Sequence, residues 1–279
     1  MADFTTKSIR NVCLLGHSGS GKTSIAEAML FAAGQTDRLG KTTDGTTVLD
    51  FDAEEKKRQY SISLATAPVV WKDIKINILD TPGFLDFEGE VAEAIRVADA
   101  AVIAVDGKAG VEVGTELAWE YVEKAGLPRA FFVNKFDDPE SNFMRTFEQL
   151  RDMFGSKVCP TFVPVDLGGE TGFVNLIYMK AYKFDAKGNR TECPMTDDIT
   201  AQVEEYIEPF KEAVASTSDE LIEKYFNGDE LTLDETVEAM HEGLIVGSIV
   251  PVMSGAASKL WGVKGLMDLI ADSFPRYTA

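Results

Sequence analysis

The chain has 279 residues, 45% of them apolar, which suffices for one large or two modest domains with a buried core. Acidic residues outnumber basic ones by 46 to 27, and the formal charge of −19 argues against binding free DNA. The three cysteines match no zinc or redox spacing, which fits a reducing, cytoplasmic compartment. No apolar run is long enough to span a bilayer, so we expect no membrane partner. We also expect a monomeric protein.

The first motif follows a predicted buried strand at residues 9–15 and precedes a predicted helix at 22–33. It has the pattern G-x-x-x-x-G-K-[ST], whose backbone N–H groups cradle a di- or triphosphate. Lys22 can reach the β- and γ-phosphate oxygens, and the Thr23 hydroxyl can ligate Mg²⁺. A chance glycine-rich turn is the alternative, and the flanking strand and helix disfavour it. The predicted phosphate-binding residues are Gly16, His17, Ser18, Gly19, Ser20, Gly21, Lys22, Thr23 and Ser24.

No periodicity is sustained from residue 35 to residue 60. Such a long irregular stretch is either functional or disordered. Because it follows a phosphate loop, we favour a mobile segment that senses the γ-phosphate over a plain disordered loop. We expect residues 36–62 to be poorly ordered without that phosphate.

Two strands are predicted next, at 61–70 and 74–79, and the second ends at Asp80-Thr81-Pro82-Gly83. Asp80 can hold Mg²⁺ through water at the strand's carboxyl end. The backbone N–H of Gly83 can turn toward a γ-phosphate. This D-x-x-G motif is weak alone, but its spacing from the phosphate loop makes it informative.

Apolar runs at 100–105 and 130–133 alternate with predicted helices at 91–98 and 113–124, which indicates a parallel sheet covered on both faces. The second run leads into the N-K-x-D pattern of Asn134, Lys135 and Asp137. The Asp137 carboxylate can accept hydrogen bonds from guanine N1–H and the exocyclic N2 amine, donors that adenine lacks. Asn134 would brace the loop, and the Lys135 stem would cover the base.

A last strand at 249–253 precedes Ser254, Gly255 and Ala256, and a helix follows. These three residues resemble a loop whose backbone contacts the guanine O6. Between Asn134 and Ser254 the chain is longer than one helix requires, which indicates an inserted module at 158–247. Its first half is β-like, with a hairpin turn at 186–189, and its second half carries helices capped by Thr196 or Asp197, Ser218 and Thr232. Its acidic helices form either a solvated face or a docking surface for a basic partner.

The full set of motifs resembles the GTP-binding domain of bacterial elongation factor G and its relatives. The resemblance implies an α/β P-loop GTPase fold, with a mostly parallel six-stranded sheet, helices on both faces and an inserted α+β subdomain. The expected parts are a first GTP-binding part at 1–157, the insertion at 158–247 and the last strand and helix at 248–279. It also implies GTP or GDP and Mg²⁺ as cofactors, the ribosome as partner, and a longer protein of which this chain is a piece.

The resemblance assigns catalytic roles to Lys22, Thr23, Ser61, Asp80, Gly83 and Phe84, and metal binding to Thr23, Ser61 and Asp80. The chain departs from the family pattern at four places. Gly19 replaces an aspartate, Ser61 replaces the switch threonine, and Gln59-Tyr60 replaces a flexible glycine and its neighbour. Phe84 replaces the histidine that orients the attacking water, so we expect slow hydrolysis and a divergent paralogue.

Three functions remain open from the sequence. The first is a translational GTPase that drives translocation or recycling of the ribosome. The second is a GTP-dependent ribosome-binding switch with little hydrolysis, which Gly19 and Phe84 favour. The third is a ribosomal protection or release-type factor.

Overall fold

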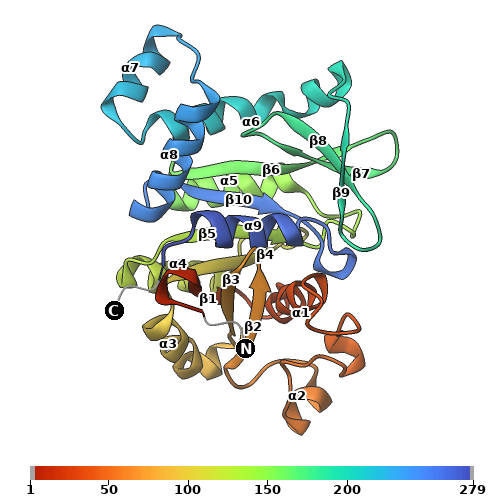
Figure 1. Ribbon diagram of the computed structural model, residues 1–279. Coiled ribbons are helices and arrows are strands. Elements are labelled where there is room, and N and C mark those ends of the chain that lie inside the picture. The colour runs from red at the N-terminus through yellow and green to blue at the C-terminus, as the bar shows by residue number, and fades with distance from the viewer. Residues whose placement is uncertain (1–3, 277–279) are drawn as a thin grey trace.

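The computed structural model describes residues 4–276, so residues 1–3 and 277–279 of the predicted first and last parts lie outside the described residues. The chain forms an α/β structure in which helices cover both faces of one extended sheet (Figure 1). Within residues 4–276, no helix is long and apolar enough to cross a membrane.

Six strands form the part of the sheet that the sequence predicts. In spatial order they are β2 (Ala65–Trp71), β3 (Ile74–Asp80), β1 (Ile9–Leu15), β4 (Ala100–Asp106), β5 (Arg129–Asn134) and β10 (Val250–Ser254). All neighbours pair in parallel except β2, which runs antiparallel to β3. The side chains of residues 100–105 are at most 1% exposed, as expected for a strand covered on both faces. The predicted mostly parallel sheet is confirmed.

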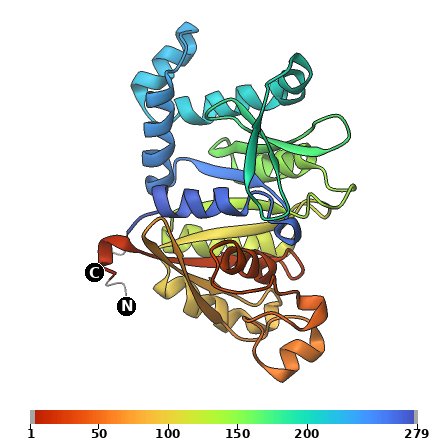
Figure 2. The ribbon, with the colours of Figure 1, turned by 45° about the vertical axis from the view of Figure 1, so that its right-hand side comes forward.

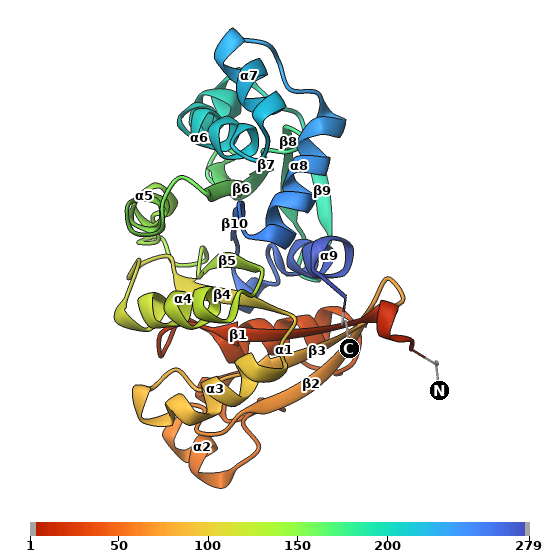
Figure 3. The ribbon, with the colours of Figure 1, turned by 90° about the vertical axis from the view of Figure 1, so that its left-hand side faces the viewer.

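The helices divide between the two faces of this sheet (Figure 3). One face carries α1 (Lys22–Ala32) and α9 (Val263–Ser273), and the other carries α3 (Glu88–Val97), α4 (Val113–Ala125) and α5 (Phe143–Phe154). Short 3-10 helices occur at η1 (Thr6–Ser8), η3 (Leu85–Phe87) and η4 (Ala257–Lys259). This arrangement places the phosphate loop, the D-x-x-G motif and the N-K-x-D motif at the carboxyl ends of β1, β3 and β5, at one edge of the sheet.

The inserted segment extends the sheet rather than forming a separate one. Its strands are β6 (Val158–Asp166), β7 (Thr171–Asn175), β8 (Lys180–Phe184) and β9 (Arg190–Cys193). Because β6 pairs in parallel with β10, the described residues form a ten-stranded sheet instead of the predicted six. The extra strands were expected, but their pairing with the central sheet was not. The buried strand β6 covers the edge of β10, whose backbone groups would otherwise be unpaired.

The predicted β region at 173–184 is two strands. A turn separates them, in which the Asn175 Oδ1 accepts hydrogen bonds from the backbone N–H groups of Ile177 and Tyr178, at 2.9 and 3.2 Å. The predicted hairpin turn at 186–189 does join β8 to β9.

The second half of the insertion contains α6 (Asp197–Ala215), α7 (Asp219–Asn227) and α8 (Leu233–Val246), which begin after the predicted caps Thr196, Ser218 and Thr232. Helix α6 packs on β6, and α8 packs on β10 and α9. These helices lie at the opposite end of the molecule from the residues that follow α1 (Figure 2). The division at 158 and 247 stays a prediction.

The segment that follows α1 is more regular than the sequence predicts. It contains η2 (Thr42–Asp44) and α2 (Ala53–Arg58). Apolar periodicity misses α2 because the helix is short and charged, although Asp52 and Glu55 form a capping box. The predicted strand at 61–70 begins instead at Ala65, because the N–H groups of residues 62–64 bind the carboxylates of Glu55 and Glu90.

The continuity of the sheet predicts cooperative unfolding. Phe173 in β7 is fully buried and stacks on Phe162 of β6, with ring centroids 5.3 Å apart. We expect Phe173→Ala to lower the free energy of unfolding by about 3–5 kcal/mol, because it leaves a cavity beside β6. Thermal unfolding followed by circular dichroism should show one transition, shifted as a whole.

Tyr178→Ala is the matched control, since Tyr178 lies in the same segment and is 50% exposed. We expect it to leave the transition in place. A Phe173→Ala profile that splits in two, with one transition unshifted, would show that the inserted segment unfolds on its own.

Candidate functional site

A cleft of about 510 Å³ opens at the carboxyl ends of β1, β3 and β5, which is the size of a small-molecule or cofactor site. It collects residues from four predicted motifs that are far apart in the sequence. The predicted residues that line it are Ser18, Gly19, Gly21, Lys22, Thr23, Ser24, Ser61, Gly83, Phe84, Asn134, Lys135 and Asp137.

Lys22 and the glycines shape the phosphate end of this cleft. The Lys22 ammonium donates hydrogen bonds to the carbonyl oxygens of Gly16 and His17, both at 2.9 Å. Gly21 has φ +94°, a conformation that favours glycine, and a Cβ there would lie 2.3 Å from the Asn134 amide nitrogen. A Cβ on Gly83 would lie 2.5 Å from Lys22 Nζ, so the D-x-x-G loop sits directly over the phosphate loop.

Two hydroxyls and a buried carboxylate lie together beside Lys22. The Thr23 and Ser61 hydroxyl oxygens are 3.0 Å apart, and Ser61 donates to the Asp50 Oδ1 at 2.7 Å. Asp80 is buried, and its Oδ1 has no hydrogen-bond partner among the described residues. Oxygen donors of this kind suit Mg²⁺.

Burial sets the electrostatics at this point. It raises the pKa of the Asp80 carboxyl and lowers the pKa of the Lys22 ammonium, and the attraction between the two groups opposes both shifts. A bound cation would stabilise the charged form of Asp80, and a bound phosphate would stabilise the charged form of Lys22. The donor set therefore fits a phosphate ligand with Mg²⁺.

Asn134 joins three loops at the other end of the cleft. Its Nδ2 donates to the carbonyl oxygen of Ser20 at 3.1 Å, and its Oδ1 accepts from the backbone N–H of Ala257 at 3.0 Å. These two hydrogen bonds are contacts through which Asn134 could brace the loops, as the sequence predicts. Asp137 is exposed to the cleft, and its Oδ2 accepts a hydrogen bond from Ser258 at 2.6 Å.

Lys135 is held by a residue that lies outside the motif. It has φ +71°, and its ammonium lies 2.7 Å from the Asp106 carboxylate at the end of β4. That contact fixes the Lys135 stem along the cleft wall.

Several predicted residues do not line the cleft. Gly16 packs against the Ala104 carbonyl, and Ser20 is buried. His17 accepts a hydrogen bond from the backbone N–H of Gly114 at 3.2 Å, which ties the phosphate loop to the start of α4. Asp80 lies beneath the lining.

The loop after β10 reaches the cleft slightly later than predicted. Ser254 is buried and donates to the Phe162 carbonyl at 2.8 Å, while Gly255 accepts from the backbone N–H of Phe136. Ala256 bridges to Trp261. The residues of this loop that line the cleft are Ala257 and Ser258. Sequence reasoning missed Ala257 and Ser258, although their place directly after the motif was a usable signal.

An aromatic pair lines the cleft beside Gly83. The rings of Tyr60 and Phe84 lie with centroids 4.6 Å apart and planes tilted by 59°. Arg58 donates a hydrogen bond to the Tyr60 hydroxyl at 3.1 Å. The pair joins the segment after α1 to the D-x-x-G loop, a contact that sequence reasoning did not anticipate.

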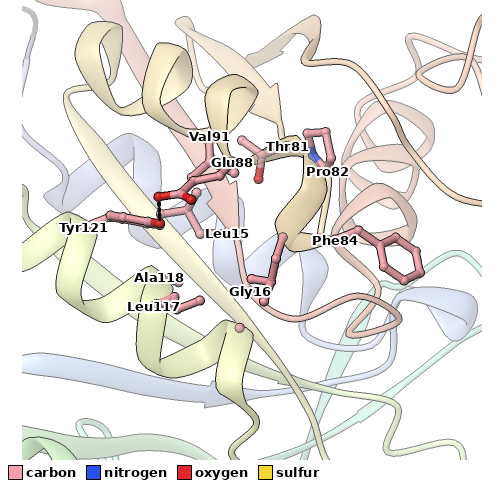
Figure 4. Close-up of a pocket in the computed structure, with 13 residues that line it drawn as sticks. Leu15, Gly16, Thr81, Pro82, Phe84, Glu88, Val91, Leu117, Ala118 and Tyr121 are labelled. Atoms are coloured by element: carbon pink, nitrogen blue, oxygen red, sulfur yellow. Dashed lines mark hydrogen bonds between the residues drawn. The ribbon is translucent and has the colours of Figure 1, made fainter.

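A smaller pocket lies behind the same loop, between α3 and α4. Figure 4 shows Glu88 and Tyr121 hydrogen-bonded to each other at this pocket, while the Phe84 ring points away from them. Phe84 is 39% exposed and also lines the larger cleft. The Phe84 side chain has no group that can form a hydrogen bond with a water molecule there.

Known proteins match almost the whole chain. A family model described as the elongation factor Tu GTP binding domain matches residues 7–276. Elongation factor G of Mycoplasma genitalium is 35% identical over 272 residues, which cover 96% of this chain and 40% of that protein. A crystal structure of a Thermus thermophilus protein superposes with a TM-score of 0.88 at 35% identity, covering 97% of this chain and 41% of that one.

The chain thus spans about two fifths of the length of these relatives. The family match includes the phosphate loop, the D-x-x-G motif and the N-K-x-D motif in one continuous range, and the structure brings all three to one cleft. The chain belongs to the elongation factor Tu GTP-binding domain family and is a translational GTPase domain similar to that of elongation factor G.

Proposed function

We propose that the cleft binds GTP and GDP together with Mg²⁺ and hydrolyses GTP. The observation that carries this proposal is the position of Asp137. Its carboxylate faces the same cleft as Lys22 and Thr23, and the Asn134 amide fixes the distance between the two ends. A guanine base at Asp137 would therefore place its phosphates on the glycine loop.

Each residue then has a defined task. Lys22 and the backbone N–H groups of Gly19, Gly21 and Gly83 donate to phosphate oxygens, which stabilises the charge that spreads over them during phosphoryl transfer. Thr23, Ser61 and Asp80 would hold Mg²⁺, the first two through their hydroxyls and the third through its carboxylate. When bound, Mg²⁺ neutralises negative charge between the β- and γ-phosphates.

The side chain at position 84 has no hydrogen-bonding group that could orient the attacking water. Phe84 packs on Tyr60 instead, and both residues line the cleft. We propose slow hydrolysis on this ground, since a positioned general base or water-orienting group contributes about 10²–10⁴-fold.

A nucleotide-dependent switch is the second candidate function. In that case GTP binding would set the conformation of residues 36–62, with hydrolysis playing little part. The Tyr60–Phe84 contact favours it, because it joins the two segments that would respond to a γ-phosphate. Phosphate release in a single turnover separates the two functions, since rapid release excludes the switch.

The whole protein's role is also a proposal. The similarity to elongation factor G supports a monomeric, cytoplasmic factor that acts on the ribosome in translocation or recycling. A protection or release-type factor would share this domain.

Guanine selectivity tests the assignment of Asp137. We expect Asp137→Asn to weaken GDP binding by about 100-fold, because the amide cannot accept from both guanine donors. Xanthosine diphosphate should gain affinity, since its C2 carbonyl can accept from the new amide. Competition against a fluorescent GDP analogue measures both effects.

Asp138→Asn is the matched control, because Asp138 also lines the cleft and carries the same charge. Its nucleotide preference should remain that of the unmodified chain. An Asp137→Asn protein that still prefers guanine to xanthine would contradict the assignment.

Hydrolysis tests the account of Phe84. We expect Phe84→His to raise the single-turnover rate of GTP hydrolysis by about tenfold or more, because imidazole can hydrogen-bond a water molecule at the γ-phosphate. The rate is measured with the full-length protein and saturating ribosomes, by quenched-flow detection of the phosphate released.

Phe84→Leu separates hydrogen bonding from ring packing, since leucine removes the contact with Tyr60 but adds no donor. Its rate should stay near that of the unmodified protein. Equal rates for the natural and histidine-bearing proteins would show that Phe84 does not limit hydrolysis.

A further inference from the structure

Glu27 is a fully buried carboxylate in the middle of α1. Its Oε1 accepts hydrogen bonds from the backbone N–H groups of Val48 at 2.6 Å and Leu49 at 3.1 Å. Its Oε2 has no hydrogen-bond partner among the described residues and lies against Gly40, where an added Cβ would approach it to 2.2 Å. One side chain thus contacts three positions of the segment that follows α1.

A buried carboxylate needs hydrogen bonds to offset its desolvation. Glu27 meets this need with donors from the loop and none from its own helix. Ordinary packing of α1 would be served by an apolar residue at this position, as at Ile25, Ala28 and Met29, which are all fully buried. The carboxylate therefore acts on the loop rather than on the stability of α1 itself.

Asp50, which follows Val48 and Leu49 in the chain, connects the Glu27 contact to the hydroxyls of Ser61 and Thr23, which we propose bind the metal. Asp50 is 2% exposed; its Oδ2 accepts from Thr47 at 2.9 Å, and its Oδ1 accepts from Ser61 at 2.7 Å. The Ser61 oxygen in turn lies 3.0 Å from the Thr23 oxygen. Asp50 directly follows Val48 and Leu49, the two residues whose N–H groups bind Glu27, so the position of those two residues sets the position of the Asp50 carboxylate.

This path begins and ends on the same helix. Thr23 and Glu27 are four residues apart in α1, so their side chains lie on one face of it. The loop is attached to that face at both positions, directly through Glu27 and through Asp50 and Ser61 at Thr23. A shift of Val48 and Leu49 would move Asp50 and release Ser61 from Thr23.

We propose that Glu27 is a positioning residue that holds Asp50, and through it Ser61, at Thr23, and so gives the site its preference for Mg²⁺-GTP over GDP. The inference rests on the proposed function, because it takes Ser61 and Thr23 as the metal-binding hydroxyls. GDP affinity depends on the glycine loop and on Asp137, which Glu27 does not touch. Loss of Glu27 should therefore weaken the binding of Mg²⁺-GTP and leave the affinity for GDP nearly unchanged.

The experiment compares Glu27→Leu with Glu27→Gln. Leucine fills a similar volume but leaves both N–H groups unpaired, while glutamine keeps a carbonyl oxygen that can accept from them. For Glu27→Leu we expect amide hydrogen exchange at residues 47–50 to rise by about tenfold or more, since the acceptor is lost. Binding of a non-hydrolysable GTP analogue with Mg²⁺ should weaken by about tenfold, and GDP binding should change less than about twofold.

Glu27→Gln should restore both slow exchange and the preference for the GTP analogue. Glu93→Leu is the control for loss of a helical glutamate, since Glu93 is exposed on α3, and should change neither measurement. If Glu27→Leu does not fold, Glu27→Met gives the same test, because methionine is flexible and also lacks an acceptor for the two N–H groups.

Equal weakening of GTP-analogue and GDP binding would overturn the inference, because it would show a general structural role for Glu27. Unchanged exchange at 47–50 would overturn it as well. Failure of the proposed function is distinguishable: an unmodified chain that binds neither nucleotide contradicts that function, whatever the variants do.

Discussion

The amide of Asn134 is the contact on which the rest of the site depends. It lies at the end of β5, donates to the phosphate loop at Ser20 and accepts from the loop after β10 at Ala257. These two hydrogen bonds fix three loops that come from distant parts of the chain. Because a Cβ on Gly21 would collide with the same amide, glycine at that position is a requirement of this contact. The Asn134 amide therefore makes a rigid frame of the cleft at the two ends where we propose that the base and the phosphates bind.

The segment between α1 and β2 is held in a different way. Its backbone N–H groups bind carboxylates, namely Glu27 at residues 48 and 49 and Glu55 at residues 62 and 63. Such contacts order a loop that has little apolar core of its own. The carboxylates of Asp50 and Glu27 also place negative charge near Asp80. A bound cation would relieve that charge. The rigid frame and the carboxylate-held segment meet where Ser61 contacts Thr23 and where Tyr60 contacts Phe84.

The sequence predicted the six central strands and the capped helices of the insertion well, because apolar runs and capping residues are local signals. The motifs also predicted most residues that line the cleft. Helix α2 was missed because nearly all of its residues are charged, which leaves no apolar periodicity. The pairing of β6 with β10 was missed because Val158 and Val250 lie far apart in the sequence, and such pairing leaves no local sequence signal. The roles of Glu27 and Asp50 could not be predicted, since both depend on where the loop returns to α1.

Nucleotide binding by the unmodified chain tests the central claim most directly. Isothermal titration with Mg²⁺ should show GDP binding at least about 100-fold more tightly than ADP, since Asp137 can pair with guanine and would be left unpaired by adenine. Equal affinities for GDP and ADP would contradict the account, because the cleft that Asn134 holds together would then not distinguish guanine from adenine.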